Sequence, residues 1–346
     1  MEIELPKIID SVAELEDLMT RPTTDLVEAL ATLEGDLMIL GVGGKTGPTL
    51  ARLAKRAFQE AGQDRRVIGV SRFSNPQHRS DLEKTGIETM VCDLLNRRQI
   101  ARLPEIPNLV FMAGMKFGSA EAQATNWAMN TLVPGYVAEH FPNSRFVALS
   151  SGNIYPFTAP ASGGPTEETE PDPLGEYAQS VLGRERIFEY FSRTRGNPVA
   201  IARLNYAIDL RYGILLDIAL KVWNGKPIDL TMGSVNAIWQ GDANRQILKC
   251  LGHCASPPSI FNIAGPEILS VRKLAEEFGR LLEKEPIFEG NEASTALLSN
   301  ASKANRLFGA PNVSVEKLIE WTAHWVSEGK PTLEKPTHFQ TRNGKF

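Results

Sequence analysis

Apolar and polar positions alternate in a regular way from Leu37 onward. Short apolar runs are followed by longer segments in which apolar residues recur at helical spacing. The pattern predicts strands at 37–41, 66–71, 87–91, 108–113 and 145–150, with helices at 48–60, 78–85, 96–102 and 122–140 between them. Strands separated by helices pair in parallel through right-handed crossovers. The sequence therefore predicts an α/β fold with an open, doubly wound parallel sheet.

The flanking segments predict further elements outside this repeat. Helical spacing is found at 11–19 and 24–33, 176–192, 215–223, 242–251, 271–282 and 315–326, and strands are expected at 227–230 and 259–263. We expect a helical N-terminal extension (1–35), a dinucleotide-binding domain (36–205), a smaller substrate-side region (206–330) and a flexible polar tail (331–346). The extension is expected to pack on the outside of the sheet, or to form a subunit contact.

A glycine-rich turn follows the first predicted strand. Gly41, Gly44 and Gly47 occur at G-x-x-G-x-x-G spacing, and a helix is predicted directly afterwards. A bound pyrophosphate needs a sharp turn, bare backbone and the positive end of a helix. The alternative is a plain tight turn, but the strand before and the second strand after favour a dinucleotide site. Its predicted cofactor contacts are Gly41, Gly43, Gly44, Lys45, Thr46 and Gly47.

Residues at the ends of later strands bear on the choice of nucleotide. Ser71 and Arg72 end the second strand, where a site for the ribose 2′-hydroxyl usually carries an acid. A hydroxyl and a guanidinium suit a 2′-phosphate, so NADP is favoured over NAD, although Arg72 is alternatively a surface cation. Asp93 is placed to accept from the adenine amino group. Leu94, Ala113 and Gly114 complete the predicted contacts at these strand ends.

Composition excludes several classes of partner. The chain has 346 residues, 42% hydrophobic and 23% charged, with a net charge of −4 and no basic cluster, which argues against nucleic acid. No window approaches the roughly 18 apolar residues of a membrane span, and the acidic start lacks a signal-peptide layout. We expect a cytoplasmic protein. Cys92, Cys250 and Cys254 fit reduced thiols, and the group Cys250, His253, Cys254 lacks a fourth ligand, so no metal is predicted.

The order and spacing of these motifs resemble the extended short-chain dehydrogenase/reductase family, which includes nucleotide-sugar epimerases and dehydratases. The resemblance covers about residues 37–327 and also rests on Asn130, 150–155, Tyr177, 203–206, Asp242 and 261–267. It implies a Rossmann sheet with a smaller C-terminal substrate-binding region. It further implies that Ser151 orients a substrate oxygen, that Tyr177 is the acid/base, that Asn130 and Asn205 serve the cofactor, and that the chain forms a homodimer through helices 122–140 and 175–192.

One position departs from the family pattern at the catalytic tyrosine. The lysine expected four residues after Tyr177 is Val181 in this chain. A phenol with an ordinary pKa near 10 needs a neighbouring cation to lose its proton at neutral pH. Lys116, just beyond the fourth strand, is the preferred replacement, and Arg184 is the second candidate. Each of them is alternatively a surface cation.

A second departure concerns the substrate. Family members that act on nucleotide sugars commonly carry an arginine shortly before the aspartate matched by Asp242, and the segment 233–242 contains none. A small sugar, polyol or sugar acid is therefore favoured over a diphosphate sugar. Its predicted contacts are Asn153, Asn236, Trp239 and Gln240, with core packing as the alternative for Trp239.

These features predict an NAD(P)-dependent oxidoreductase or epimerase that transfers a hydride at a secondary hydroxyl. The alternative is a catalytically inactive NADP-binding redox sensor or regulatory protein, for which Val181 is the best argument. Retention of Ser151 and Tyr177 argues against it, because a sensor needs neither. The long loop at 156–173 is expected to close over the site.

Overall fold

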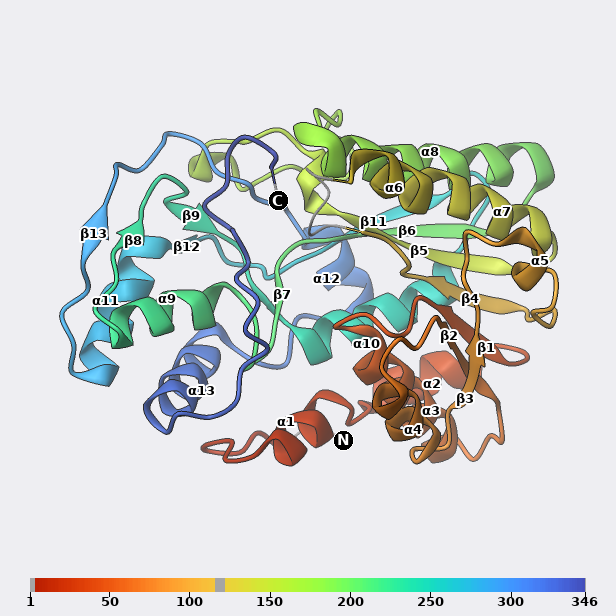
Figure 1. Cartoon of the computed structure of the whole chain (residues 1–346), viewed down its shortest axis with the longest axis horizontal. Helices are drawn as coiled ribbons and strands as arrows, with labels where there is room; N and C mark the ends of the chain where they lie inside the picture. Colours follow the sequence, from red (N-terminus) through yellow and green to blue (C-terminus); the bar gives the residue numbers. More distant parts are fainter. Residues whose placement is uncertain (1–3, 116–121, 346) are drawn as a thin grey trace.

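Seven parallel strands form the central sheet of the computed structural model, which describes residues 4–115 and 122–345 (Figure 1). The strand order is β11-β6-β5-β4-β1-β2-β3. The bounds are β1 (Leu37–Leu40), β2 (Val67–Ser71), β3 (Glu88–Val91), β4 (Asn108–Phe111), β5 (Arg145–Ser151), β6 (Val199–Leu204) and β11 (Ser259–Ile263). The order runs outward from β1 in both directions, which confirms the predicted doubly wound sheet. The reversal lies between β1 and β4, so a ligand is expected beyond their carboxyl ends.

Helices cover both faces of the sheet. One face carries α2 (Thr24–Ala31), α3 (Gly47–Glu60), α10 (Gln240–Lys249) and α12 (Ser302–Phe308), and α4 (Pro76–Glu83) lies on the same side (Figure 1). The other face carries α5 (Arg97–Ile100), α6 (Gln123–Trp127), α7 (Val133–His140) and α8 (Gly175–Arg195). Strand β1 explains the two layers, because all four of its residues are buried. Leu37 and Ile39 join the core under α3, whereas Met38 and Leu40 join the core under α8.

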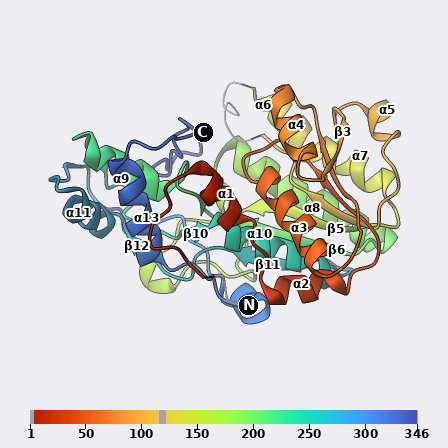
Figure 2. The same ribbon diagram turned by 90° about the horizontal axis from the view of Figure 1, so that it is seen from below.

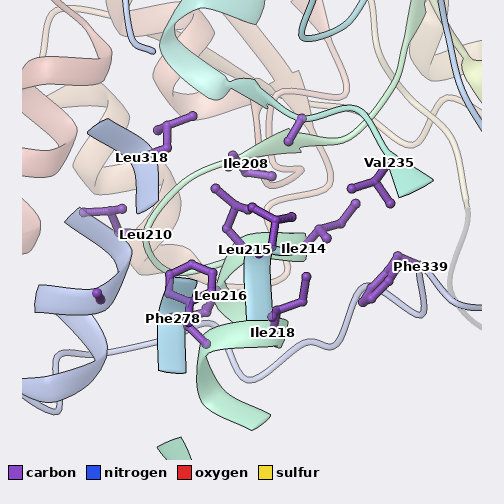
Figure 3. Close-up of a cluster of buried hydrophobic side chains, with 14 of the residues drawn as sticks. Ile208, Leu210, Ile214, Leu215, Leu216, Ile218, Val235, Phe278, Leu318 and Phe339 are labelled. Atoms are coloured by element: carbon purple, nitrogen blue, oxygen red, sulfur yellow. The ribbon is translucent and has the colours of Figure 1, made fainter. Parts of the chain in front are cut away.

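The substrate-side region has a core of its own. Helices α9 (Ile214–Trp223), α11 (Val271–Leu282) and α13 (Val315–Ser327) pack around it, as Figure 3 shows for side chains from all three helices. Short strand pairs frame these helices: β7 (Ala207–Ile208) with β10 (Ile238–Trp239), β8 (Ile228–Asp229) with β13 (Phe288–Glu289), and β9 (Ser234–Val235) with β12 (Leu269–Ser270). The helices predicted from apolar spacing in this region are therefore confirmed.

The N-terminal helices connect the two regions. Helix α1 (Val12–Met19) begins after Ser11, whose hydroxyl caps it, and it lies between the two regions in Figure 2. Leu15 and Leu18 enter the substrate-side core, whereas α2 packs into the sheet core. Glu16 accepts hydrogen bonds from Arg52 of α3 at 2.6 Å and from Arg211 at 2.9 Å. The extension therefore packs on α3 and α10, which cover one face of the sheet, and also ties the two regions together.

The tail corrects one prediction. Residues 331–345 form no regular element but are packed, and in Figure 1 they run between the sheet and the α9–α13 region. Thr337 donates from its backbone N at 2.8 Å and from its hydroxyl at 2.6 Å to the Asp217 carboxylate. Phe339 is only 3% exposed and lies in the substrate-side core (Figure 3). Arg342 donates to the carbonyl of Thr295 at 2.7 Å. The flexible tail inferred from polar composition is wrong for these residues, because a few anchors fix the segment.

Candidate active site

Two adjacent cavities lie beyond the carboxyl ends of β1, β2, β4 and β5. The cofactor cavity measures about 390 Å³ and lies along the glycine-rich loop, β2 and β3. The reaction cavity measures about 290 Å³ and extends from β5 and α8 to the segment after β6. Met112 and Gly114 line both cavities, so the two meet at the end of β4. One extended ligand can therefore reach from the first into the second.

The glycine-rich loop fits a bound pyrophosphate. Gly41 has a φ of +94°, and a Cβ there would lie 2.5 Å from the backbone N of Ala113. A Cβ on Gly47 would lie 2.2 Å from the carbonyl oxygen of Val42, so the first residue of helix α3 must be a glycine to pack this closely against the turn. A Cβ on Gly44 would meet only the carbonyl oxygen of Gly41, at 3.6 Å, and so would project into the cofactor cavity. Thr46, the N-cap of α3, makes no side-chain capping bond, which leaves the first amides open to an anion.

The cofactor cavity is lined by most of the residues predicted to contact the adenosine part of the cofactor. Ser71, Arg72, Asp93, Leu94, Ala113 and Gly114 line this cavity, together with Gly41, Gly43 and Gly44. Asp93 is held in place, since its Oδ1 accepts from the backbone N of Leu95 at 3.0 Å. Phe73, Asn75 and His78, which follow Arg72, also line the cavity and were not among the predicted contacts. The available signal was their position directly after β2.

Ser151 and Tyr177 are brought together in the reaction cavity. Ser151 ends β5, and its Oγ accepts from the backbone N of Asn153 at 3.2 Å. Tyr177 lies in the first turn of α8, and its hydroxyl is hydrogen-bonded to the Ser151 side chain. Burial raises the pKa of Tyr177, while the Arg184 charge and the bond to Ser151 act in the opposite direction. The cavity therefore holds a tyrosine with a cation within electrostatic reach.

Arg184 is the cation beside Tyr177 in the described part of the chain. It lies two turns along α8, is 6% exposed and lines the reaction cavity. Its Nη1 donates to the carbonyl of Leu149 at 2.7 Å, and its Nη2 donates to Asn130 Oδ1 at 2.5 Å. Val181 is buried against Ile154 and Tyr155 and does not line the cavity. Lys116, which was preferred to Arg184 as the replacement for the missing lysine, lies outside the described residues.

Two residues that were predicted to contact the cofactor lie outside both cavities and support their neighbours. Asn130 is fully buried in the π-helical segment Ala128–Leu132 between α6 and α7, lines neither cavity, and donates to Ser180 Oγ at 2.9 Å. Its contacts position Arg184 and the backbone of Met115. Gly47 is also buried outside both cavities and serves the close approach of α3. These placements correct their expected direct contact with the cofactor.

A second wall of the reaction cavity comes from residues after β6 and from the tail. Lys45 and Thr46 reach into the reaction cavity, as do Asn205, Tyr206 and Tyr212. Thr337 of the tail also lines it. Sequence analysis did not identify the two tyrosines or Thr337 as site residues, although Tyr206 directly follows Asn205 of the recognised motif.

Three of the four predicted substrate contacts lie elsewhere. Asn153 lines the reaction cavity, but the described positions of Asn236, Trp239 and Gln240 are buried outside it. Asn236 donates to the carbonyl of Glu267 at 2.8 Å and accepts from the backbone N of Ser299 at 2.9 Å. Trp239 packs against Trp321, and Gln240 donates to Thr49 Oγ1 at 2.9 Å. These side chains hold the fold together, and their prediction as substrate contacts was wrong.

The long loop also differs from its prediction. Residues 156–173 are held by backbone pairing of Thr158 with Ala296 and by a bond from Asn300 N to the carbonyl of Pro165 at 2.8 Å. Glu167 accepts from the backbone N of Asn262 at 2.8 Å. None of the loop residues lines the reaction cavity in the described structure. The loop packs beside β11 and does not cover the site.

The parallel sheet, the glycine-rich loop and the Ser151–Tyr177 pair agree with the resemblance to the extended short-chain dehydrogenase/reductase family. The model of the NAD dependent epimerase/dehydratase family matches residues 37–208, and this part of the chain belongs to the family. No curated protein sequence is significantly similar to the chain. Within the described residues, no helix combines the length and apolar character needed to cross a membrane.

Solved structures share the fold at low sequence identity. MoeE5 in complex with UDP-glucose and NAD has a TM-score of 0.67 and 18% identity, covering 85% of this chain and 99% of its own. DesIV, a dTDP-glucose 4,6-dehydratase from Streptomyces venezuelae with NAD and TYD bound, has a TM-score of 0.70 and 20% identity, covering 85% and 97%. A UDP-glucuronic acid 4-epimerase from Bacillus cereus in complex with NAD has a TM-score of 0.68 and 16% identity, covering 85% and 99%.

Proposed function

We propose that the chain is an NADP-dependent oxidoreductase or epimerase that transfers a hydride at a secondary hydroxyl of a small sugar, polyol or sugar acid. One observation carries the proposal: the Ser151–Tyr177 pair lies in a cavity that meets the glycine-loop cavity at Met112 and Gly114. The residues that would hold a nicotinamide in the reaction cavity therefore include Gly114, Ser151 and Tyr177. The similar structures of MoeE5 with UDP-glucose and NAD, and of the dTDP-glucose 4,6-dehydratase DesIV with NAD and TYD, support the reaction class.

The roles of the two hydroxyl groups follow from their positions. The nicotinamide, when bound, supplies or accepts the hydride. Ser151 donates a hydrogen bond to the substrate oxygen and holds it beside Tyr177. The Tyr177 oxygen takes the hydroxyl proton as the alcohol is oxidised and returns it when the carbonyl is reduced. Because burial raises the pKa of Tyr177, the opposing charge of Arg184 favours the deprotonated form that oxidation needs.

Two features favour a small substrate over a nucleotide sugar. Asn236, in the segment where the family commonly has an arginine, is buried and bonded to backbone groups. Thr337 brings the anchored tail to the wall of the reaction cavity, which limits the space beyond it. The substrates named for the related structures are therefore not carried over to this chain.

Arg184 removes the main argument for the alternative of an inactive sensor. Its argument was that Val181 leaves Tyr177 without a cation. Arg184 lies within electrostatic reach of the phenol, so the cation is supplied from a different turn of the same helix.

We further propose that the protein is a cytoplasmic homodimer formed through α6, α7 and α8. The apolar side chain of Leu132, which is 52% exposed, supports that contact face.

The preference for NADP is tested at Arg72. This exposed side chain lines the cofactor cavity next to Ser71. Arg72→Ala is expected to weaken NADPH binding about tenfold or more and to leave NADH binding within twofold, because only NADPH offers the 2′-phosphate. Nicotinamide fluorescence titration measures both affinities. Arg79→Ala on α4 is the matched control, since Arg79 bonds to Glu83 and Thr89 and lines neither cavity. Equal affinity of the native chain for both cofactors would overturn the preference.

The role of Arg184 is tested by the pH dependence of oxidation. Its charge lowers the pKa of Tyr177, so Arg184→Met raises that pKa and moves the rising limb of the oxidation rate to higher pH. At pH 7 the rate is expected to fall about tenfold or more and to recover in part at alkaline pH, while Arg184→Lys retains more activity. Circular dichroism and cofactor titration show whether each variant is folded. An unshifted profile in folded Arg184→Met would remove Arg184 from the mechanism.

A further inference from the structure

The reaction cavity is rich in hydrogen-bond donors and cations. Lys45 and Arg184 both line it, and no aspartate or glutamate is among its described lining residues. This local balance contrasts with the net charge of −4 of the whole chain. Arg184 is already held by Leu149 and Asn130, whereas Lys45 comes from the glycine-rich loop. Lys45 is therefore the cation to consider for a ligand.

Lys45 of the glycine-rich loop lines the cavity and contacts the segment after β6. Its Nζ donates to the carbonyl of Ala207 at 3.1 Å and lies 4.1 Å from the centre of the Tyr212 ring. In the described part of the chain, no carboxylate forms an ion pair with it. Asp209 lies near enough to act on its charge but is bonded to Arg211. An ammonium has three donors, so the arrangement leaves donors of Lys45 for a ligand.

The electrostatic state of Lys45 agrees with an anion site. Burial lowers the pKa of Lys45 to about 8, and the charge of Asp209 acts in the opposite direction. The ammonium is therefore largely protonated at pH 7 but poorly solvated. An anion that enters the cavity replaces the lost solvation, which makes its binding favourable.

Asn205 gives an independent observation on the same wall. Its side chain is 2% exposed and lines the reaction cavity, and its Nδ2 has no hydrogen-bond partner among the described residues. Buried amide donors are nearly always bonded, so this group is suited to a ligand oxygen. Tyr206 directly after it has a φ of +46°, which turns the chain from β6 into the cavity wall.

We propose that the reaction cavity binds a substrate with a carboxylate, which Lys45 holds through its ammonium while Asn205 donates to a neighbouring oxygen of the same molecule. The inference rests on the proposed function and narrows it to a sugar acid or a similar hydroxy acid. The other possible anion is a phosphate of the cofactor. Lys45 lines the reaction cavity and not the cofactor cavity, which favours the substrate.

The test compares matched acids and neutral compounds. Protein saturated with NADP⁺ is titrated calorimetrically with D-glucuronate against D-glucose, D-galacturonate against D-galactose, and D-gluconate against D-glucitol. At least one acid is expected to bind about tenfold more tightly than its neutral partner. Lys45→Met is expected to remove that preference and to leave NADP⁺ affinity within twofold. Lys55→Met on α3 is the control, because it removes the same charge from a lysine whose Nζ bonds to the carbonyl of Arg65, outside both cavities.

Each other outcome overturns the inference in a distinguishable way. An acid preference that survives in Lys45→Met, a preference for neutral compounds, or no acid binding to the NADP⁺ complex would each refute the carboxylate site. Loss of NADP⁺ binding in Lys45→Met alone would make the cofactor phosphate the partner of Lys45. Failure of the native chain to bind either NADP⁺ or NAD⁺ would instead refute the proposed function itself.

Discussion

Tyr177→Phe is expected to lower the turnover number by about a thousandfold, while NADP⁺ affinity stays within twofold of the native value. The substitution removes the hydroxyl that exchanges the substrate proton and keeps the ring, and general acid–base catalysis contributes about 10²–10⁴-fold. Ser151 and Arg184 remain in place, so the cavity keeps its shape and charge. The measurement is the rate of NADPH formation with a sugar acid that the native enzyme oxidises.

Tyr190→Phe provides the matched control for this variant. Tyr190 lies on the same helix, is 60% exposed and is remote from the described cavity lining. It is expected to retain native turnover. If Tyr177→Phe kept more than a tenth of the native rate, another group would have to move the proton, and the role given to Tyr177 would be lost.

Local sequence signals were sufficient for the sheet and for much of the site. Strands such as Leu37–Leu40 are short, apolar and buried on both faces, so they stand out without tertiary information. The glycine spacing reflects a tight turn that side chains would obstruct, so Gly41 and Gly44 were predicted to line the cofactor site, and both line the cofactor cavity. Even so, Val199–Leu204 was not among the predicted strands, and the helix predicted at 122–140 contains the π-helical segment Ala128–Leu132.

Long-range packing decided what the sequence could not show. Polar side chains such as Asn236 and Gln240 suit a ligand as well as they suit buried backbone partners, and only the fold distinguishes the two. Arg184 was only the second candidate for the cation, but its bonds to Leu149 and Asn130 hold it within electrostatic reach of Tyr177. The tail is polar on average, yet Thr337 and Phe339 anchor it to residues far away in the sequence.

A buried ion pair holds together the elements that carry the proposed catalytic residues. Arg203 of β6 and Glu185 of α8 are joined at 2.8 Å, with side chains 3% and 2% exposed. Arg203 also donates to the Tyr155 hydroxyl at 2.6 Å, and the Ser150 hydroxyl donates to Glu185. Ser150 precedes Ser151, and Glu185 follows Arg184, so the pair fixes the two elements that carry the reaction.

Arg203→Met is therefore expected to lower the free energy of unfolding by about 3–5 kcal/mol, because it leaves the Glu185 carboxylate buried without its partner. Urea unfolding followed by circular dichroism measures the change. Arg193→Met breaks an exposed pair with Glu189 on the same helix, with side chains 59% and 27% exposed, and is expected to cost no more than about 1 kcal/mol. Adding Glu185→Leu to Arg203→Met should recover part of the loss, since it removes the unpaired charge. A loss below about 1 kcal/mol for Arg203→Met alone would show that Glu185 does not depend on this partner.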